Sequence, residues 1–230
     1  MTGSDLPLDV ALLDIDGTLL DSTYHHALAW ARAFAAVGEP IPLYRIHRLI
    51  GMGGDKLLAE LLDEDTLDRV GEEAQSRWKT EYDRLIDETR LFPGARDLLD
   101  RLQGLGLSVV LASSSIPEHA EHALRELEAS DRTDAWTTAE DADESKPHPE
   151  LLETALDRVG ADGARAVMIG DATWDVKAAA RAGIPTIGLR SGGFGEQELV
   201  DAGAAAVYED PRDLAEHLDE ALRAAASHAG

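Results

Sequence analysis

The 230-residue sequence predicts an α/β protein built on a doubly wound parallel sheet. Short apolar runs of strand length alternate with amphipathic stretches of helix length, which is typical of repeated β-α-β units. The apolar runs are nearly continuous, as expected for parallel strands that are buried on both faces. Because ligands bind at the carboxyl ends of the strands in such sheets, the residues that follow each run are the candidates for function.

Each expected element follows from its own pattern. The apolar runs predict strands at Val10–Ile15, Leu107–Ala112, Ala164–Ile169, Ile184–Leu189 and Ala204–Tyr208. Helical spacing of apolar residues predicts helices at Gly94–Leu105, Pro117–Ala129, Pro149–Val159, Thr173–Ala182 and Pro211–Ala226.

The region from about Ser22 to Arg90 interrupts this rhythm, because it has segments of helical period and no convincing strand. Two apolar stripes mark its helices, one with Leu57, Leu58, Leu61 and Leu62, the other with Val70, Ala74, Trp78, Tyr82 and Leu85. We therefore expect a core domain formed by residues 1–21 and 91–230. A small helical domain, residues 22–90, is inserted after the first strand.

The chain carries 45 acidic and 21 basic residues, a formal net charge of −24. Because nucleic-acid affinity comes largely from neutralising phosphates with Lys and Arg, this charge argues against DNA and RNA and disfavours anionic membrane surfaces. The absence of cysteine excludes disulfides, a thiolate nucleophile and Cys-ligated metal sites. The first residues do not resemble a signal peptide and no apolar run is long enough for a membrane span, so a cytoplasmic location is expected.

Two aspartates follow the first predicted strand, in the sequence Asp14-Ile15-Asp16-Gly17-Thr18. Residues i and i+2 of an extended chain point the same way, so Asp14 and Asp16 are expected to project together. Two adjacent carboxylates at a buried strand end repel each other and normally need a cation or a shared proton. A strand followed by a plain polar turn is the alternative.

A second polar group, Ser113, Ser114 and Ser115, follows the second predicted strand. Ser115 and Glu118 have the spacing of a capping box, with Pro117 in the first turn, so Ser115 is expected to cap the following helix. Ser113 stands at the strand terminus. Hydroxyls here, with backbone N–H groups at the helix N-terminus, suit a phosphate oxygen, and Ser113 and Ser114 are the candidates.

Two further strand ends carry charged residues. Lys146, one of only four lysines, lies in a proline-framed loop, although a lone loop lysine is usually a solvated surface residue. Asp171 stands where the third predicted strand stops, and Asp175 lies in the first turn of the next helix, where a helix-dipole interaction is the alternative role. One face of the sheet is thus expected to hold Asp14, Asp16, Ser113, Lys146, Asp171 and Asp175.

The ordered motifs D-x-D-G-T, S, K-P and G-D-x-x-x-D resemble those of the haloacid dehalogenase-like (HAD) hydrolase superfamily, over essentially the whole chain. The resemblance implies a Rossmann-like core and an α-helical cap formed by the insertion. It also implies that Asp14 is a nucleophile forming an aspartyl-phosphate, and that Asp16 is the general acid and base. This second role asks for a raised pKa at Asp16, which neighbouring carboxylates can provide.

The same resemblance implies Mg²⁺ as the cofactor. Its expected ligands are Asp14, the main-chain carbonyl of Asp16, and Asp171, with Asp175 holding a metal-bound water or ligating directly. Ser113, Ser114 and Lys146 are expected to hold the phosphoryl oxygens. Haloacid dehalogenases and phosphonate-cleaving relatives lack an aspartate in the position of Asp16, so this residue favours a phosphate ester as substrate.

Specificity is expected from the inserted helical domain. His25 and His26 follow the first motif, and the loop that contains Arg48, Gly51 and Lys56 resembles the specificity loop of phosphoglycolate phosphatase-like members. Arg48 and Lys56 are candidates to pair with a second anionic group of the substrate. A simple interhelical turn at 51–54 is the alternative.

Other features are given structural roles. His119 and His122 lie three residues apart on a predicted surface helix, where a solvated face is favoured over zinc binding. The glycine-rich stretch at 191–195 lacks the G-x-G-x-x-G spacing of a dinucleotide site. The four tryptophans are expected to be packing residues.

The leading hypothesis is a Mg²⁺-dependent phosphatase that acts on a small phosphorylated metabolite and is similar to phosphoglycolate phosphatase. A sugar-phosphate mutase of the β-phosphoglucomutase type shares these core residues and is the enzymatic alternative. A non-catalytic binding or regulatory protein that keeps the fold is the alternative from another class. Phosphoglycolate, a sugar phosphate, a nucleoside monophosphate and pyrophosphate remain open as substrates.

Overall fold

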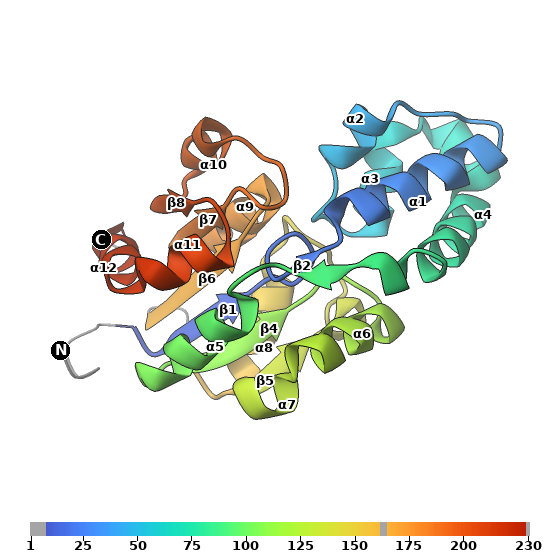
Figure 1. The fold of residues 1–230 in the computed structure, drawn as a ribbon. Coiled ribbons are helices and arrows are strands. Elements are labelled where there is room, and N and C mark those ends of the chain that lie inside the picture. Colours follow the sequence, from blue (N-terminus) through green and yellow to red (C-terminus); the bar gives the residue numbers. More distant parts are fainter. Residues whose placement is uncertain (1–7, 162–164, 229–230) are drawn as a thin grey trace.

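A parallel six-stranded sheet forms the centre of the protein in the computed structural model, which describes residues 8–161 and 165–228 (Figure 1). Its strand order is β5-β4-β1-β6-β7-β8. The strands are β1 (Val10–Leu13), β4 (Ser108–Ala112), β5 (Ala135–Thr137), β6 (Ala166–Gly170), β7 (Thr186–Leu189) and β8 (Ala206–Tyr208). This arrangement confirms the α/β fold class that the apolar runs predict.

The register of the sheet aligns the carboxyl ends of its three central strands. Leu13 of β1 pairs with Leu111 of β4 on one side and with Ile169 of β6 on the other. The residues that follow these three positions therefore emerge at the same edge of the sheet. This alignment brings together polar residues that are more than 150 positions apart in the sequence.

Two layers of helices cover the sheet because successive strand residues point to opposite faces. Ala11 and Leu13 pack with α5 and α12, whereas Val10 and Leu12 pack with α8 and α9. The helices of the core are α5 (Ala95–Gly104), α6 (Pro117–Leu127), α7 (Ala129–Arg132), α8 (Glu150–Arg158), α9 (Thr173–Arg181), α10 (Glu196–Ala202), α11 (Pro211–Glu216) and α12 (Leu218–His228), with a 3₁₀ turn, η3, at Ala139–Asp141.

The sequence prediction missed or merged some of these elements. Strand β5 is a three-residue edge strand with a half-exposed Trp136, so it leaves no apolar run to detect. The single helix expected at 211–226 is two helices, because His217 leaves helical geometry with φ −112° and ψ 18°. Ala164, the expected start of the third strand, lies outside the described residues.

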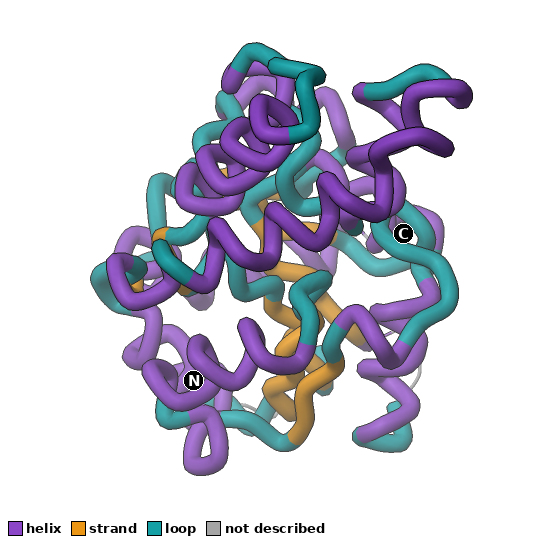
Figure 2. The backbone as a smooth tube through the Cα atoms, turned by 90° about the vertical axis from the view of Figure 1, so that its right-hand side faces the viewer, coloured by secondary structure: helices purple, strands orange, loops and turns teal. Residues whose placement is uncertain are grey.

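Residues 22–90, which we call the insert, hold a separate group of helices above the sheet edge (Figures 1 and 2). They are α1 (Thr23–Ala36), α2 (Leu43–His47), α3 (Gly54–Leu61), α4 (Glu64–Asp83) and the 3₁₀ turn η2 (Ile86–Glu88). A short antiparallel pair, β2 (Leu20–Asp21) and β3 (Arg90–Leu91), joins the insert to the core. The insert has its own apolar cluster, centred on Trp30, Phe34 and Leu57.

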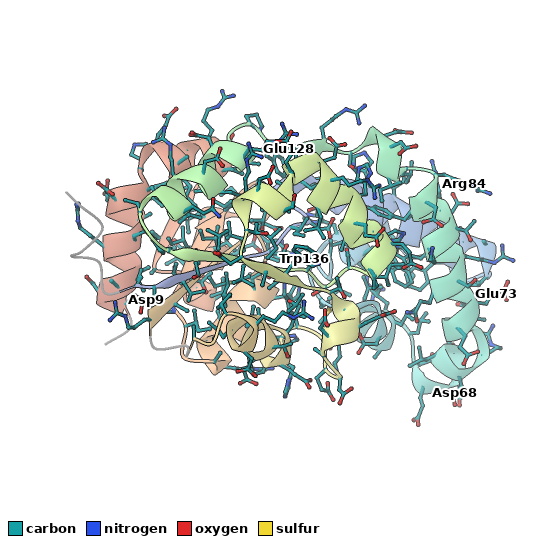
Figure 3. All side chains as sticks on the ribbon, turned by 90° about the horizontal axis from the view of Figure 1, so that it is seen from below. Asp9, Asp68, Glu73, Arg84, Glu128 and Trp136 are labelled. Atoms are coloured by element: carbon teal, nitrogen blue, oxygen red, sulfur yellow. The ribbon has the colours of Figure 1, made fainter. Side chains whose placement is uncertain are left out.

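Charged side chains project outward all round the molecule, as the labelled Asp68, Glu73 and Arg84 illustrate (Figure 3). Arginines make most of the surface ion pairs, including Arg77 with Glu73. No helix within 8–161 and 165–228 combines the length and the apolarity needed to cross a bilayer.

Candidate active site

Asp14 and Lys146 form a buried ion pair at the carboxyl end of β1. The Nζ atom of Lys146 lies 2.6 Å from Oδ1 of Asp14 and 2.8 Å from Oδ1 of Asp175. It also donates a hydrogen bond to the carbonyl oxygen of Ala112, at 3.3 Å. Lys146 is completely buried and Asp14 is only 4% exposed, so neither group is solvated as a surface residue would be.

Asp14, Asp171 and Asp175 each offer a carboxylate oxygen, and these oxygens lie within 4.8 Å of one another. Burial raises the pKa of Asp14 to about 7, against the opposing effect of Lys146, and the charge of Asp175 adds to the rise. Burial, Asp175 and Asp14 also raise the pKa of Asp171 well above its usual value. Three buried carboxylates facing one ammonium group leave unbalanced negative charge, which a divalent cation with oxygen ligands would offset.

Lys146 stays charged despite its burial. Desolvation alone would lower the pKa of its ammonium group, but the charges of Asp14 and Asp175 raise it overall. The site therefore holds a fixed positive charge next to Asp14, shielded from solvent.

Asp16 occupies a different environment from the other three aspartates. Its Oδ1 accepts hydrogen bonds from Ser22 Oγ at 2.5 Å and lies 3.2 Å from His26 Nε2, while its Oδ2 accepts from Ser115 Oγ at 2.6 Å. Its carboxylate is not part of the group of three that could hold a metal ion. The binding of a metal ion by the main-chain carbonyl of Asp16, which the family resemblance implies, stays a prediction.

The expected rise in the pKa of Asp16 is wrong for this structure. Burial does raise it, but His26, Ser115 and Ser22 together lower the pKa below its usual value. Neighbouring carboxylates therefore do not dominate this side chain. Ser22 precedes α1 and His26 lies in it, six and ten residues after Asp16, whereas Ser115 comes from the loop after β4, 99 residues away.

Ser115 is a site residue that the sequence analysis assigned to helix capping. The N-cap of α6 is Ile116, which has no side-chain cap, and Ser115 instead donates to Asp16. Ser113 accepts a hydrogen bond from the backbone N–H of Ser115, at 3.0 Å, which holds the loop in place. The buried Oγ atom of Ser114 has no hydrogen-bond partner among the described residues and so is available to a ligand.

Thr18 and the loop after β7 support the acidic cluster. Thr18 Oγ1 donates to Asp171 Oδ1 at 2.9 Å, and Ser191 Oγ donates to the carbonyl oxygen of Gly17 at 2.6 Å. At Gly192 any side chain would collide with Asp171, because a Cβ atom there would lie 1.6 Å from Oδ2. Thr18 belongs to the first motif, so its position signalled a role that the sequence analysis did not assign.

A cavity of ≈ 60 Å³ lies between these residues and the insert. The core contributes Asp14, Asp16, Ser114 and Ser115, and the insert contributes His26, Trp30, Ile50, Gly51, Met52, Gly54, Leu57 and Trp78. Gly51 has φ +100°, and a Cβ atom there would approach that of Ala172 to 2.8 Å, so glycine lets the loop close on the core.

The structure brings some of the insert candidates to this cavity and leaves others outside it. His26 and Gly51 line it. Arg48 instead pairs with Glu198 and lies 4.3 Å over the ring of Phe194, and Lys56 Nζ lies 2.7 Å from Glu144. His25 is on α1 and does not line the cavity.

His119 is not on a solvated face, which corrects the expectation for the helix that carries it. It is 5% exposed, and its Nε2 lies 2.8 Å from Oδ1 of Asp83 at the end of α4. Burial lowers its pKa. Because α6 belongs to the core and α4 to the insert, this contact joins the two beside the cavity.

A family model described as haloacid dehalogenase-like hydrolase matches residues 8–183, which include all of the acidic cluster and Lys146. The chain belongs to the haloacid dehalogenase-like hydrolase family. The resemblance found in the sequence motifs is thereby confirmed, and the protein is a hydrolase of this family.

Known phosphatases and solved structures are similar to this hydrolase, and three of them illustrate the likeness. Validoxylamine A 7'-phosphate phosphatase from Streptomyces hygroscopicus subsp. limoneus is 31% identical, over 78% of this chain and 84% of its own length. A phosphoglycolate phosphatase from Pseudomonas savastanoi pv. phaseolicola is 28% identical, over 89% of this chain and 78% of its own. The crystal structure of a hydrolase from Pseudomonas syringae has a TM-score of 0.87 and 38% identity, covering 92% of this chain and 98% of that one.

Proposed function

We propose that this hydrolase is a Mg²⁺-dependent phosphatase that cleaves a small-molecule phosphomonoester through an aspartyl-phosphate on Asp14. The observation that carries the proposal is the buried contact between Asp14 and Lys146 at the floor of a cavity that Asp16 also lines. Similarity to enzymes named as phosphatases, including one for validoxylamine A 7'-phosphate, supports the substrate class. A small phosphorylated metabolite is the proposed partner.

The donor set of the acidic cluster fits Mg²⁺, which prefers carboxylate oxygens and keeps several waters. Asp14, Asp171 and Asp175 would hold the ion, and Thr18 orients Asp171 through its hydrogen bond. A bound Mg²⁺ supplies positive charge that stabilises the phosphoryl oxygens during transfer.

Asp14 starts the reaction when a carboxylate oxygen attacks phosphorus and the ester P–O bond breaks. Asp16 gives a proton to the departing alcohol oxygen, and the approach of the phosphate dianion promotes its protonation by raising its pKa. Asp16 then takes a proton from a water, whose oxygen attacks phosphorus and releases inorganic phosphate from Asp14. Lys146 and Ser114 bind phosphoryl oxygens throughout.

The test measures hydrolysis of p-nitrophenyl phosphate with Mg²⁺ and the mass of the protein quenched in acid. We expect turnover, release of one inorganic phosphate per alcohol, and a phosphoryl adduct that Asp14→Asn lacks. Asp21→Asn, which changes an exposed carboxylate at the end of β2, is the matched control and should keep full activity. Transfer of the phosphate to a second sugar instead of to water would favour the mutase.

A further inference from the structure

A second cavity adjoins the first one. It has a volume of ≈ 310 Å³, and Gly54, Trp78 and Ser114 line both cavities. The first cavity, at ≈ 60 Å³, is well below the 300–1,000 Å³ of ordinary ligand pockets, whereas the second falls within that range. A phosphoryl group held at Asp14 thus leaves the rest of the substrate to extend past Trp78 into the second cavity.

The lining of the second cavity is acidic. Asp55 comes from the insert, and Asp143 and Glu144 come from the core, while none of its described lining residues is a lysine or arginine. The nearest candidate cation, Lys56, is already engaged, with its Nζ 2.7 Å from Glu144 and 4.0 Å from Asp55. Asp55, Asp143 and Glu144 are exposed, so solvent screens part of their charge, but together they still disfavour a second anionic group on the substrate here.

Two buried polar atoms of the shared wall lack hydrogen-bond partners among the described residues. They are Nε1 of Trp78, which can only donate, and Oγ of Ser114, which can donate or accept. Unpaired buried donors are uncommon in folded proteins, and a ligand is one way in which they are satisfied. A hydroxyl group suits this wall because it accepts from Trp78 and can donate to the carboxylates beyond it.

We propose that the second cavity binds the alcohol portion of the substrate, and that this portion carries several hydroxyl groups and no second anion. The proposal rests on the phosphatase function proposed above and names its substrate class. It favours a phosphorylated sugar or cyclitol over an ester whose alcohol portion carries a carboxylate, such as phosphoglycolate. Arg48 and Lys56 then keep the insert on the core through their pairs with Glu198 and Glu144.

The experiment compares substrate pairs that match in size and differ in one carboxylate. Glucitol 6-phosphate is paired with 6-phosphogluconate, and 2-hydroxyethyl phosphate with 2-phosphoglycolate, each with Mg²⁺ at low ionic strength. We expect kcat/KM to favour the neutral member of each pair by about fivefold, the size of like-charge repulsion between exposed groups about 4 Å apart in water. Added salt should reduce this ratio by screening the repulsion.

Two variants locate the effect in the cavity. Asp143→Lys should remove most of the preference for the neutral member, because it removes one repulsion and adds an attraction. Asp68→Lys makes the same charge change on an exposed part of α4 that does not line the cavity, and should leave the preference intact (Figure 3). Trp78→Phe keeps an aromatic ring at this position but removes the indole N–H donor. It should therefore lower kcat/KM for glucitol 6-phosphate, which carries hydroxyl groups, more than for p-nitrophenyl phosphate.

The outcomes separate this proposal from the proposed function. If p-nitrophenyl phosphate is hydrolysed but the anionic members are preferred, the substrate class is wrong and the phosphatase function stands. If Asp143→Lys and Asp68→Lys change the preference equally, the assignment to this cavity is overturned. If no phosphomonoester is hydrolysed, both proposals fail together.

Discussion

The Nζ atom of Lys146 lies 2.6 Å from Oδ1 of Asp14, where both side chains are shielded from solvent. Lys146 comes from the loop before α8, 132 positions along the chain from Asp14. This single contact links the stability of the core to the proposed chemistry. Removing either partner leaves the other as a buried charge. The effect on the free energy of unfolding should differ between Lys146 and Asp14.

Lys146→Ala should abolish turnover and destabilise the protein. Breaking a buried ion pair by removing one partner costs about 3–5 kcal/mol, and here two carboxylates lose their cation. Urea denaturation measures the free energy of unfolding, and p-nitrophenyl phosphate hydrolysis measures turnover. Lys79→Ala is the control, because its exposed pair with Asp83 is worth at most about 0.5 kcal/mol. Equal stabilities of the two variants would contradict the role of Lys146.

Asp14→Asn should abolish turnover and yet stabilise the metal-free protein as the pH rises. The pKa of Asp14 is about 7 in the folded state and 3.8 when the group is unperturbed, as in the unfolded state. Between these two pH values the folded state therefore binds more protons than the unfolded state. Stability from this group therefore falls as the pH rises from about 4 to about 7, with no further change above.

The measurement is the melting temperature of both proteins in EDTA across this range. The difference between Asp14→Asn and the wild type should grow with pH and shrink when Mg²⁺ is added, because the cation offsets the charge. A difference that stays constant with pH would show that Asp14 titrates normally.

Thr18→Val should weaken Mg²⁺ binding without unfolding the site. The hydroxyl of Thr18 holds Asp171 in place, and loss of such supporting hydrogen bonds typically costs about 10- to 100-fold in metal affinity. Titration of activity with Mg²⁺ gives the half-saturating concentration, which should rise by that factor. Thr18→Ser retains the hydroxyl and should behave as the wild type. The same half-saturation in Thr18→Val would remove Thr18 from the metal site.

His26→Gln should raise the pKa of Asp16, because the charge and hydrogen bond of His26 are leading causes of its low value. The proposed mechanism needs Asp16 protonated to release an alkyl alcohol. The alkaline limb of kcat for an alkyl phosphate should therefore move to higher pH.

Two comparisons keep this test specific. The alkaline limb of kcat for p-nitrophenyl phosphate should not move in His26→Gln, because p-nitrophenolate leaves without needing a proton from Asp16. His25→Gln changes the neighbouring histidine of α1, for which no contact with Asp16 is found, and should leave both profiles unchanged. A limb that moves to lower pH in His26→Gln would show that His26 does not lower the pKa of Asp16.

The motifs and apolar runs were sufficient to predict the sheet and to gather Asp14, Lys146, Asp171 and Asp175 at its edge. The strands are marked by short-range apolar patterns. Once the strands are placed, the residues that follow them are expected to meet, because parallel strands have their carboxyl ends side by side. Elements with weak local patterns, such as β5 and α10, were missed. The catalytic and metal-binding roles of these residues stay predictions that the experiments above address.

The sequence by itself determined the fold class and the acidic strand ends, which depend on periodicity and on local spacing, and the order of its four motifs indicated the family by resemblance. Only the tertiary structure decided which partner each side chain has. Asp16 meets Ser115 at a separation of 99 positions, His119 is buried against Asp83, and Lys56 is held by Glu144. The pKa of a carboxylate depends on burial and on charges within a few ångströms, which are set by packing within the core and of the insert against it.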